Sequence, residues 1–369
     1  MITRSGFLLT NREKQSWTAT WFSGTPVWGK GWLEILQGVL QFPGWNTLSG
    51  ICWLCDCTPA ELREVGPDAG WRNRRLSHWD LIHRIRRNNV EVSPLFSSPF
   101  LKGSCFKIDW LHAVDQGVGA DFLGNFFYYV VRELLEGANL TERCSSLWMK
   151  IQAYYRRHEV QDRLQLLRFS MLRKEKASPK LRASAAEARA LIPFALELAN
   201  EVLDDANPFH AAMKSAAYHL LQCYKSLSKE SIFWEDVLRT SSRKFAAQYI
   251  ALEMATDKPK TWVVKPKMHV FLELCSSGSQ PSLFWTYRDE DFGGACARWS
   301  RRRGGLLKPW PCSSGLLDRF RMRHPVPRIR WEKKNRWRSC AQLMSRSHVP
   351  LVVCYVHIYM NLLKLADVH

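Results

Sequence analysis

The stretch ADFLGNFFYYVVRELLEG, residues 120–137, decides the fold class predicted for the middle of this 369-residue chain. Its apolar residues recur three and four positions apart, the spacing that lines up side chains on one side of an α-helix. Gly137, Pro179 and Pro208 punctuate the region, as expected of residues that end or begin helices. The same spacing returns in LWMKIQAYYRRH (147–158), RLQLLRFSMLR (163–173), KLRASAAEARALIPFALELANEVL (180–203), FHAAMKSAAYHLLQCYKSL (209–227) and FWEDVLRTSSRKFAAQYIALEMA (233–255). We therefore predict an all-helical block over residues 122–256.

Two short segments beside this block have the composition of β-strands. CFKI, residues 105–108, is short and apolar, and KTWVVKPKMHVFLEL, residues 260–274, begins with β-branched and aromatic residues and could be a strand leading into a helix. The predicted fold class is α/β and helix-dominated, with a core in two parts, residues 51–121 and 257–305, around the helical insertion. Residues 1–50 read as short strands and turns, and residues 306–369 as a basic, partly irregular segment.

The composition indicates a globular protein with an affinity for polyanions. A hydrophobic content of 46% with 17 Trp is enough to fill a core, and the formal net charge is +19. The segment from Arg298 to Arg338 holds 14 Lys and Arg against two acids, Asp318 and Glu332, and so carries +12 of that charge. Nucleic acid is the expected partner of such a segment, and DNA the first choice.

Cysteine usage and hydropathy restrict the compartment. The chain has 11 Cys at irregular spacings, which does not fit the disulfide framework of a small secreted protein and indicates a reducing environment. We find neither a signal-peptide core near the N-terminus nor the run of roughly 18 apolar residues that a membrane helix needs. The sequence therefore predicts a nuclear or otherwise intracellular protein without a membrane span.

Two groups of acids could take part in catalysis. Asp109 and Asp115, with His112 as a supporting residue, lie within DWLHAVDQGVGADF, residues 109–122, and Glu290 lies in the later acidic turn WTYRDEDFGG, residues 285–294. Carboxylates from distant segments can hold two Mg²⁺ or Mn²⁺ ions about 4 Å apart and so cleave a phosphodiester. The alternative for the first group is a capped helix start, which we also assign to Asp121, and for the second group a solvated turn.

Basic residues could support such a site. Lys265, Lys267 and His269 lie together in KPKMH, close to a predicted core element, and could contact phosphate or a metal. A structural histidine bonded to a backbone carbonyl is the alternative for His269. Further along the chain, arginine alternates with Trp and Phe from RWSRRRGG onward, which suits phosphate contact and stacking. We expect weak, sequence-independent nucleic-acid binding there, through Arg301, Arg302 and Arg303, or else a solvated basic tail.

The segment CWLCDC, residues 52–57, suggests a zinc site. Zn²⁺ favours thiolate and imidazole ligands, and Cys52 and Cys55 have the Cys-x2-Cys spacing of half a tetrahedral site. His78 and His83 could supply the other half, with a separation from the cysteines longer than is usual. Buried free thiols are the alternative.

The order of these motifs resembles a known family. DWLH leading into DQGV, a long helical insertion, KPKMH and then FWTYRDEDFGG looks like DDE-type transposases with an RNase H-like core, and within them the CACTA-like group. The resemblance covers residues 50–320. It implies an RNase H-like core, divalent-metal-dependent DNA strand cleavage or transfer, Asp109 as second catalytic acid with Asp115 as its substitute, and Glu290 as the last acid.

The chain departs from that family at the first catalytic acid. The acids upstream do not lie on a convincing strand; they are Asp56, Glu61, Glu64, Asp68 and Asp80. The resemblance therefore implies a transposase-derived, nucleic-acid-binding protein with a degenerate active site. The alternative from another class is a non-catalytic helical binding module, zinc-stabilised, in which the acids are caps and turns. A third interpretation is that the two ends are not part of the native fold.

Overall fold

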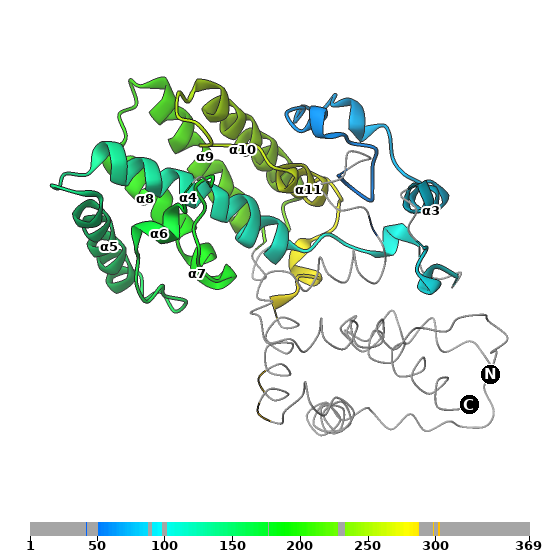
Figure 1. Cartoon of the computed structure of the whole chain (residues 1–369), viewed down its shortest axis with the longest axis horizontal. Helices are drawn as coiled ribbons and strands as arrows, with labels where there is room; N and C mark the ends of the chain where they lie inside the picture. Colours follow the sequence, from blue (N-terminus) through cyan, green and yellow to red (C-terminus); the bar gives the residue numbers. More distant parts are fainter. Residues whose placement is uncertain are drawn as a thin grey trace. The chain divides into compact units, whose positions relative to one another are not determined.

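The computed structural model describes residues 42, 51–87, 91–97, 102–175, 177–227, 233–287, 298 and 302. Nearly all of them belong to one compact unit, residues 27–286 (Figure 1). Helices and turns make up these residues, and the only extended pairing among them is an isolated antiparallel bridge between Cys55 and Arg75. The described part of the chain is therefore an α-helical structure with no β-sheet.

The helices fall into a sparse first part and a dense second part. The first part contains the short 3-10 helices Pro59–Glu61, Gly70–Arg72, Pro94–Ser97 and Gly103–Cys105 and the α-helix α3 (His78–Arg87). The second part begins with a π-helix, Leu111–Val118, which continues into α4 (Gly119–Tyr129) and a second π-helix, Val130–Leu134. There follow α5 (Leu140–Arg157), α6 (Phe169–Leu172), α7 (Ala185–Ala190), α8 (Ile192–Val202), α9 (Pro208–Lys225), α10 (Glu235–Ala255), α11 (Pro266–Cys275) and the 3-10 helix Pro281–Leu283.

Helix α4 is the centre of the second part. Its residues are buried on every side from Gly119 to Tyr128, as expected for a helix that is apolar all round. Figure 1 shows α9 and α10 on one side of α4 and α5, α6 and α7 on the other. The rings of Phe122 and Phe126 stack at 5.9 Å between centroids, and Phe245 of α10 meets Phe122 at the same distance. Aromatic side chains around α4 thus pack on one another as part of the hydrophobic core.

Capping side chains that were not predicted begin the outer helices, close to the predicted breaks at Gly137, Pro179 and Pro208. The Asn139 side chain accepts hydrogen bonds from the first backbone N–H groups of α5. Ser184 and Glu187 form a reciprocal capping box at α7, and Asn207 caps α9 just before Pro208. These interactions satisfy backbone donors that a helix leaves unpaired at its first turn. The helices predicted around residues 120–137, 147–158, 209–227 and 233–255 are confirmed, and the helix predicted from Lys180 begins at Ala185.

One helix of the predicted series is wrong. Only Phe169–Leu172 is helical within RLQLLRFSMLR. The preceding residues form an irregular segment in which Leu164 and Leu167 are buried and the Leu164 N–H donates to the Tyr155 hydroxyl at 3.0 Å. Apolar spacing alone did not distinguish this loop, which packs its leucines without a regular backbone, from a helix.

The α/β fold class with an RNase H-like core is also wrong for the described residues. The expected strand at residues 105–108 begins within the 3-10 helix Gly103–Cys105, and it has no strand partner among the described residues. In the second expected strand, Lys260 and Trp262 have positive φ angles of 63° and 54°, which a strand does not allow. This backbone buries the Trp262 ring, and the Trp262 N–H donates to Asn125 Oδ1 at 2.7 Å. β-Branched composition was therefore overridden by tertiary contacts with α4.

The predicted domain boundaries and the predicted structure of the two terminal segments stay predictions. The proposed boundaries at residues 51, 122, 257 and 306 are not tested, and the expected structure of residues 1–50 and 306–369, Phe42 apart, lies outside the described residues. Among the helices that are described, none combines the length and the apolar character needed to cross a bilayer.

Candidate metal centre

The Cys-x2-Cys loop folds into a tight turn held by backbone hydrogen bonds. The Leu54 N–H points at Cys52 Sγ, 3.3 Å away, and Ile51 N–H donates to Cys57 O at 3.2 Å. Next to it, Asp56 N–H donates to Arg74 O and Leu76 N–H donates to Leu54 O. An amide directed at a sulfur stabilises the thiolate form, which is the form that binds metals.

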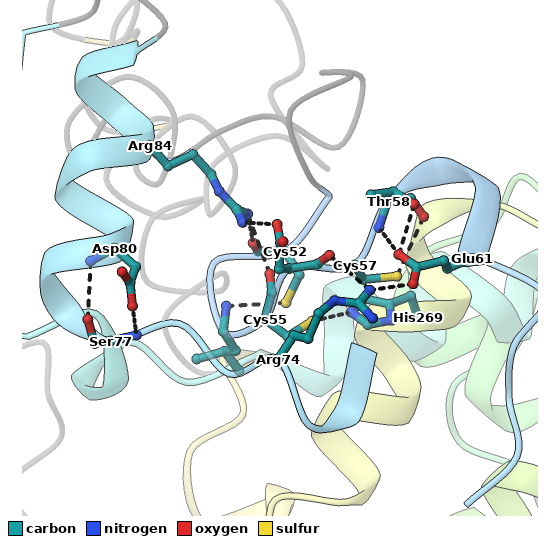
Figure 2. Close-up of polar contacts among 12 residues, drawn as sticks. Cys52, Cys55, Cys57, Thr58, Glu61, Arg74, Ser77, Asp80, Arg84 and His269 are labelled. Carbon is teal, nitrogen blue, oxygen red and sulfur yellow. Dashed lines mark hydrogen bonds and ion pairs between the residues drawn. The ribbon is translucent and has the colours of Figure 1, made fainter. Parts of the chain in front are cut away.

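Helix α11 brings the other two side chains of the cluster. His269 and Glu273 are four residues apart and so lie on one side of the helix, which Pro266 begins at its first turn. The distance from His269 Nε2 to Cys55 Sγ is 3.2 Å and to Glu273 Oε1 3.8 Å. One ligand atom from each of Cys52, Cys55, His269 and Glu273 lies within 4.8 Å of all the others, and these four side chains could hold a metal ion (Figure 2 shows the three residues Cys52, Cys55 and His269 together).

All four side chains are inaccessible to solvent. The exposed fraction is 0% for both cysteines, 2% for His269 and 4% for Glu273. Burial opposes ionisation of Cys52, but hydrogen bonds with Cys55 and His269 lower the pKa of its thiol to about 5. The hydrogen bond with Cys52 and burial raise the pKa of the Cys55 thiol. One thiol of the pair therefore ionises easily, whereas the second would lose its proton to a bound metal.

A second set of residues fixes the orientation of the α11 side chains. Arg75 Nη1 lies 2.6 Å and 2.7 Å from the two carboxylate oxygens of Glu273. The Trp71 ring meets the His269 ring edge-on with centroids 4.4 Å apart, and Trp71 Nε1 donates to Glu64 O. Such supporting contacts restrict the rotamers of ligands in metal sites.

The sequence prediction found half of this cluster. Cys52 and Cys55 are in it, but His78 and His83 are not: His78 packs against Phe96 with ring centroids 5.6 Å apart, and His83 is exposed on α3. His269 was predicted to support catalytic acids, and Glu273 was missed. The signal for Glu273 was its spacing from His269, His-x3-Glu on a helix that begins at Pro266. The pairing with cysteines 214 residues away carried no local signal.

The predicted catalytic acids have structural partners. Asp109 Oδ2 accepts from the His112 backbone N–H at 3.0 Å and lies 2.5 Å from His112 Nδ1, while Asp109 Oδ1 accepts from Thr286 N–H at 2.9 Å. Asp109 therefore bonds the first turn of the π-helix as a helix cap does. Glu290 lies outside the described residues, so its pairing with Asp109 stays a prediction.

The two other acids of that stretch are buried in different environments. The Tyr224 hydroxyl donates to Asp115 Oδ1 at 2.5 Å, and burial raises the pKa of Asp115 to about 8. Asp121, expected to be a first-turn acid, forms an ion pair with Lys265 at 2.7 Å. At neutral pH Asp115 is therefore mostly protonated, which makes it a poor ligand for Mg²⁺ or Mn²⁺.

The predicted phosphate-contacting residues are only partly described. Lys267 is half-buried and donates from Nζ to the backbone oxygens of His112 and Gln116, at 2.8 Å and 3.2 Å. Burial lowers the pKa of Lys267 to about 7. Arg302 is exposed, whereas Arg301 and Arg303 lie outside the described residues. The lysines of KPKMH thus stabilise the start of the π-helix and α4.

Comparisons with protein-family models, with curated proteins and with solved structures found no match for this chain. The resemblance to DDE-type transposases therefore stays untested. The metal cluster and its surroundings are the strongest guide to what the described residues do.

Proposed function

We propose that this protein is a helical binding module in which a structural Zn²⁺ ion joins the Cys-x2-Cys loop to α11. The observation that carries the proposal is the buried group of Cys52, Cys55, His269 and Glu273, with ligand atoms within 4.8 Å of one another. A single ion at this point would cross-link two segments that are more than 200 residues apart.

The ligand chemistry favours zinc over the other common divalent ions. Mg²⁺ and Ca²⁺ bind oxygen ligands, whereas two thiolates and an imidazole nitrogen with one carboxylate oxygen suit Zn²⁺. The charges also balance. The negative charges of the two thiolates and the Glu273 carboxylate equal the positive charges of the Zn²⁺ ion and of the Arg75 guanidinium that contacts Glu273. Neutrality matters here because an uncompensated charge in a buried site costs several kcal/mol.

The burial of the cluster supports a structural role for the metal. A catalytic zinc site keeps one position open for water or substrate, while a structural site is closed by four protein ligands. The four side chains are 0–4% exposed, so water has no access to a metal held between them. A two-metal nuclease centre has less support, because Asp109 is engaged with His112 and Thr286 and Asp115 with Tyr224.

Metal analysis of the purified full-length protein tests the proposal. We expect one zinc per chain by inductively coupled plasma mass spectrometry, and its loss in Cys52→Ser and His269→Ala. Cys57→Ser is the matched control, because Cys57 is buried in the same loop but lies outside the cluster. Zinc-free protein, or zinc that persists in Cys52→Ser and His269→Ala, contradicts the proposal; zinc lost in Cys57→Ser contradicts the ligand set.

A further inference from the structure

We propose that the exposed side of α3 is a contact surface for single-stranded nucleic acid. This inference goes beyond the metal site: it concerns a partner, and it assigns that partner to residues outside the basic C-terminal tract. The α3 surface is defined here as Trp79, His83, Arg86 and Arg87.

Helix α3 separates its residues cleanly into two sides. Leu81, Ile82 and Ile85 are 1–3% exposed and pack into the core. The four residues of the α3 surface are all exposed and lie within a narrow arc, because positions 79, 83, 86 and 87 are four, seven and eight residues apart on a helix of 3.6 residues per turn. The apolar side of the helix is thus fully used, and the polar side is available to a partner.

The α3 surface is positively charged at its C-terminal end. Arg86 and Arg87 occupy the last turn, and among the described residues no carboxylate forms an ion pair with either of them. Asp80, the single acid of the helix, is bonded at the other end, where its Oδ2 accepts from Ser77 N–H at 2.8 Å. Two guanidinium groups without a counter-ion among the described residues match the phosphates of a polyanion.

Trp79 adds a stacking platform to this charge. Its side chain is 67% exposed, although Trp is usually well buried in folded proteins. Arginines beside an exposed aromatic ring are the combination that binds single strands, with the guanidinium groups on phosphates and the ring under an unpaired base. Paired bases in a duplex do not offer that ring face, so the exposed indole favours a single strand.

The α3 surface lacks the features of a membrane-binding helix. Interfacial helices insert a broad apolar face into the lipid boundary. In α3 the apolar face is buried in the protein, and Trp79 is the single large apolar side chain on the exposed side. Nucleic acid therefore fits the surface better than an anionic bilayer.

Arg84 ties α3 to the proposed metal loop. From the buried side of α3 it donates to Cys52 O at 3.0 Å, and its Nη2 pairs with Asp56 Oδ1 at 2.5 Å (Figure 2). The loop that holds the cysteines therefore also fixes the position of α3. A link of this kind makes nucleic-acid binding sensitive to the metal while keeping the two sites chemically separate.

Fluorescence anisotropy with a labelled oligothymidylate, at several salt concentrations and with the full-length protein, tests the inference. We expect Trp79→Ala to weaken binding about tenfold, the loss typical of one stacked base. Arg86→Gln/Arg87→Gln should flatten the dependence of log K on log salt by about 1.4, the value for two phosphate contacts on a single strand. The matched control is Arg156→Gln/Arg168→Gln, which removes the same charge from exposed arginines elsewhere.

The outcomes separate this inference from the metal proposal. Four outcomes would each contradict the assignment of nucleic-acid binding to the α3 surface, whatever the zinc content. Two concern the variants: equal effects of the two arginine pairs, or unchanged binding in Trp79→Ala. Two concern the ligand: tighter binding to a duplex of the same length, or binding to phosphatidylserine vesicles in place of the oligonucleotide. Zinc-free protein whose oligonucleotide binding still depends on Trp79 and Arg86 would overturn the metal proposal alone. Circular dichroism of each variant verifies that a loss of oligonucleotide binding is not caused by global unfolding.

Discussion

The part of the chain around α4 and the part from Ile51 to Arg87 are held together by different forces. Around α4, large apolar side chains such as Phe122, Phe126 and Phe245 pack on one another. Between Ile51 and Arg87 there is a single α-helix, and long polar side chains, Arg75 and Arg84, reach across the segment to Glu273 and to the Cys loop. The first arrangement is stable through buried area, whereas the second adds a few directed polar interactions to a smaller buried set that includes Trp71, Leu81 and Ile85.

The most severe test of this contrast is removal of the proposed metal ion. A chelator should abolish the amide hydrogen-exchange protection of residues 51–87, because structural zinc contributes roughly 10 kcal/mol or more to folding in small zinc-binding segments. Protection in α4, α9 and α10 should stay close to its original level. The measurement is hydrogen exchange with mass spectrometry before and after chelation, with zinc re-addition as the control.

Uniform loss of protection would show that the two parts fold as one unit. Unchanged protection of residues 51–87 would show that their polar contacts suffice without an ion.

A substitution in the centre of α4 tests the other side of the contrast. A Cβ atom on Gly124 would lie 2.2 Å from the Lys180 Cα, a backbone atom that cannot move aside. We expect Gly124→Ala to lower the free energy of unfolding by about 3 kcal/mol, a typical cost of overpacking a core. Urea denaturation measures it, and Gly66→Ala is the control, since a Cβ there meets only Asp68 N at 4.0 Å.

An unchanged free energy of unfolding in Gly124→Ala would mean that the segment at Lys180 does not pack against α4. The zinc content of the variant should not change in its folded form, because neither residue contacts the cluster.

The smallest expected effect concerns the buried acid Asp115. Because burial raises its pKa to about 8 in the folded state, well above the value of about 4 in an unfolded chain, the folded state holds a proton that the unfolded state releases. This contribution to stability is complete below about pH 4 and is lost as pH rises through about 8. Asp115→Asn should therefore remove about 2 kcal/mol of the fall in unfolding free energy between pH 5 and pH 6.5.

Urea titrations of wild type and Asp115→Asn at those two pH values measure the difference, and Tyr224→Phe serves as the control for loss of the hydrogen bond alone. Parallel pH profiles of wild type and Asp115→Asn would place the folded-state pKa of Asp115 near its ordinary value.

Much of the helical structure was predictable, because it follows from local spacing. The run around Phe122 and the proline at 208 were read from neighbours in the sequence. The caps at Asn139 and Asn207 were not predicted, but their signal is equally local. The segment at Trp262 was predicted wrongly as a strand, because its conformation depends on a hydrogen bond with Asn125, 137 residues away. Local composition cannot encode such a contact.

The candidate metal site shows the same division. The two cysteines were recognisable from their spacing, and so in principle was His269 with Glu273. Joining the two halves required the fold, and the nearer histidines, His78 and His83, were chosen in its absence. Proximity along the chain favoured these two histidines, but in the structure His78 packs against Phe96 and His83 is exposed to solvent.

The large separation of the two halves of the cluster has a consequence for the order of events during synthesis. The ribosome exposes the Cys pair long before it makes α11, since 214 residues separate Cys55 from His269. Domains generally fold as synthesis proceeds, from the N-terminus onward, and closing a long loop carries an entropic cost. If the proposed Zn²⁺ binds here, a nascent chain would offer it only half a site, and stable metal binding would have to wait until the intervening helices have assembled.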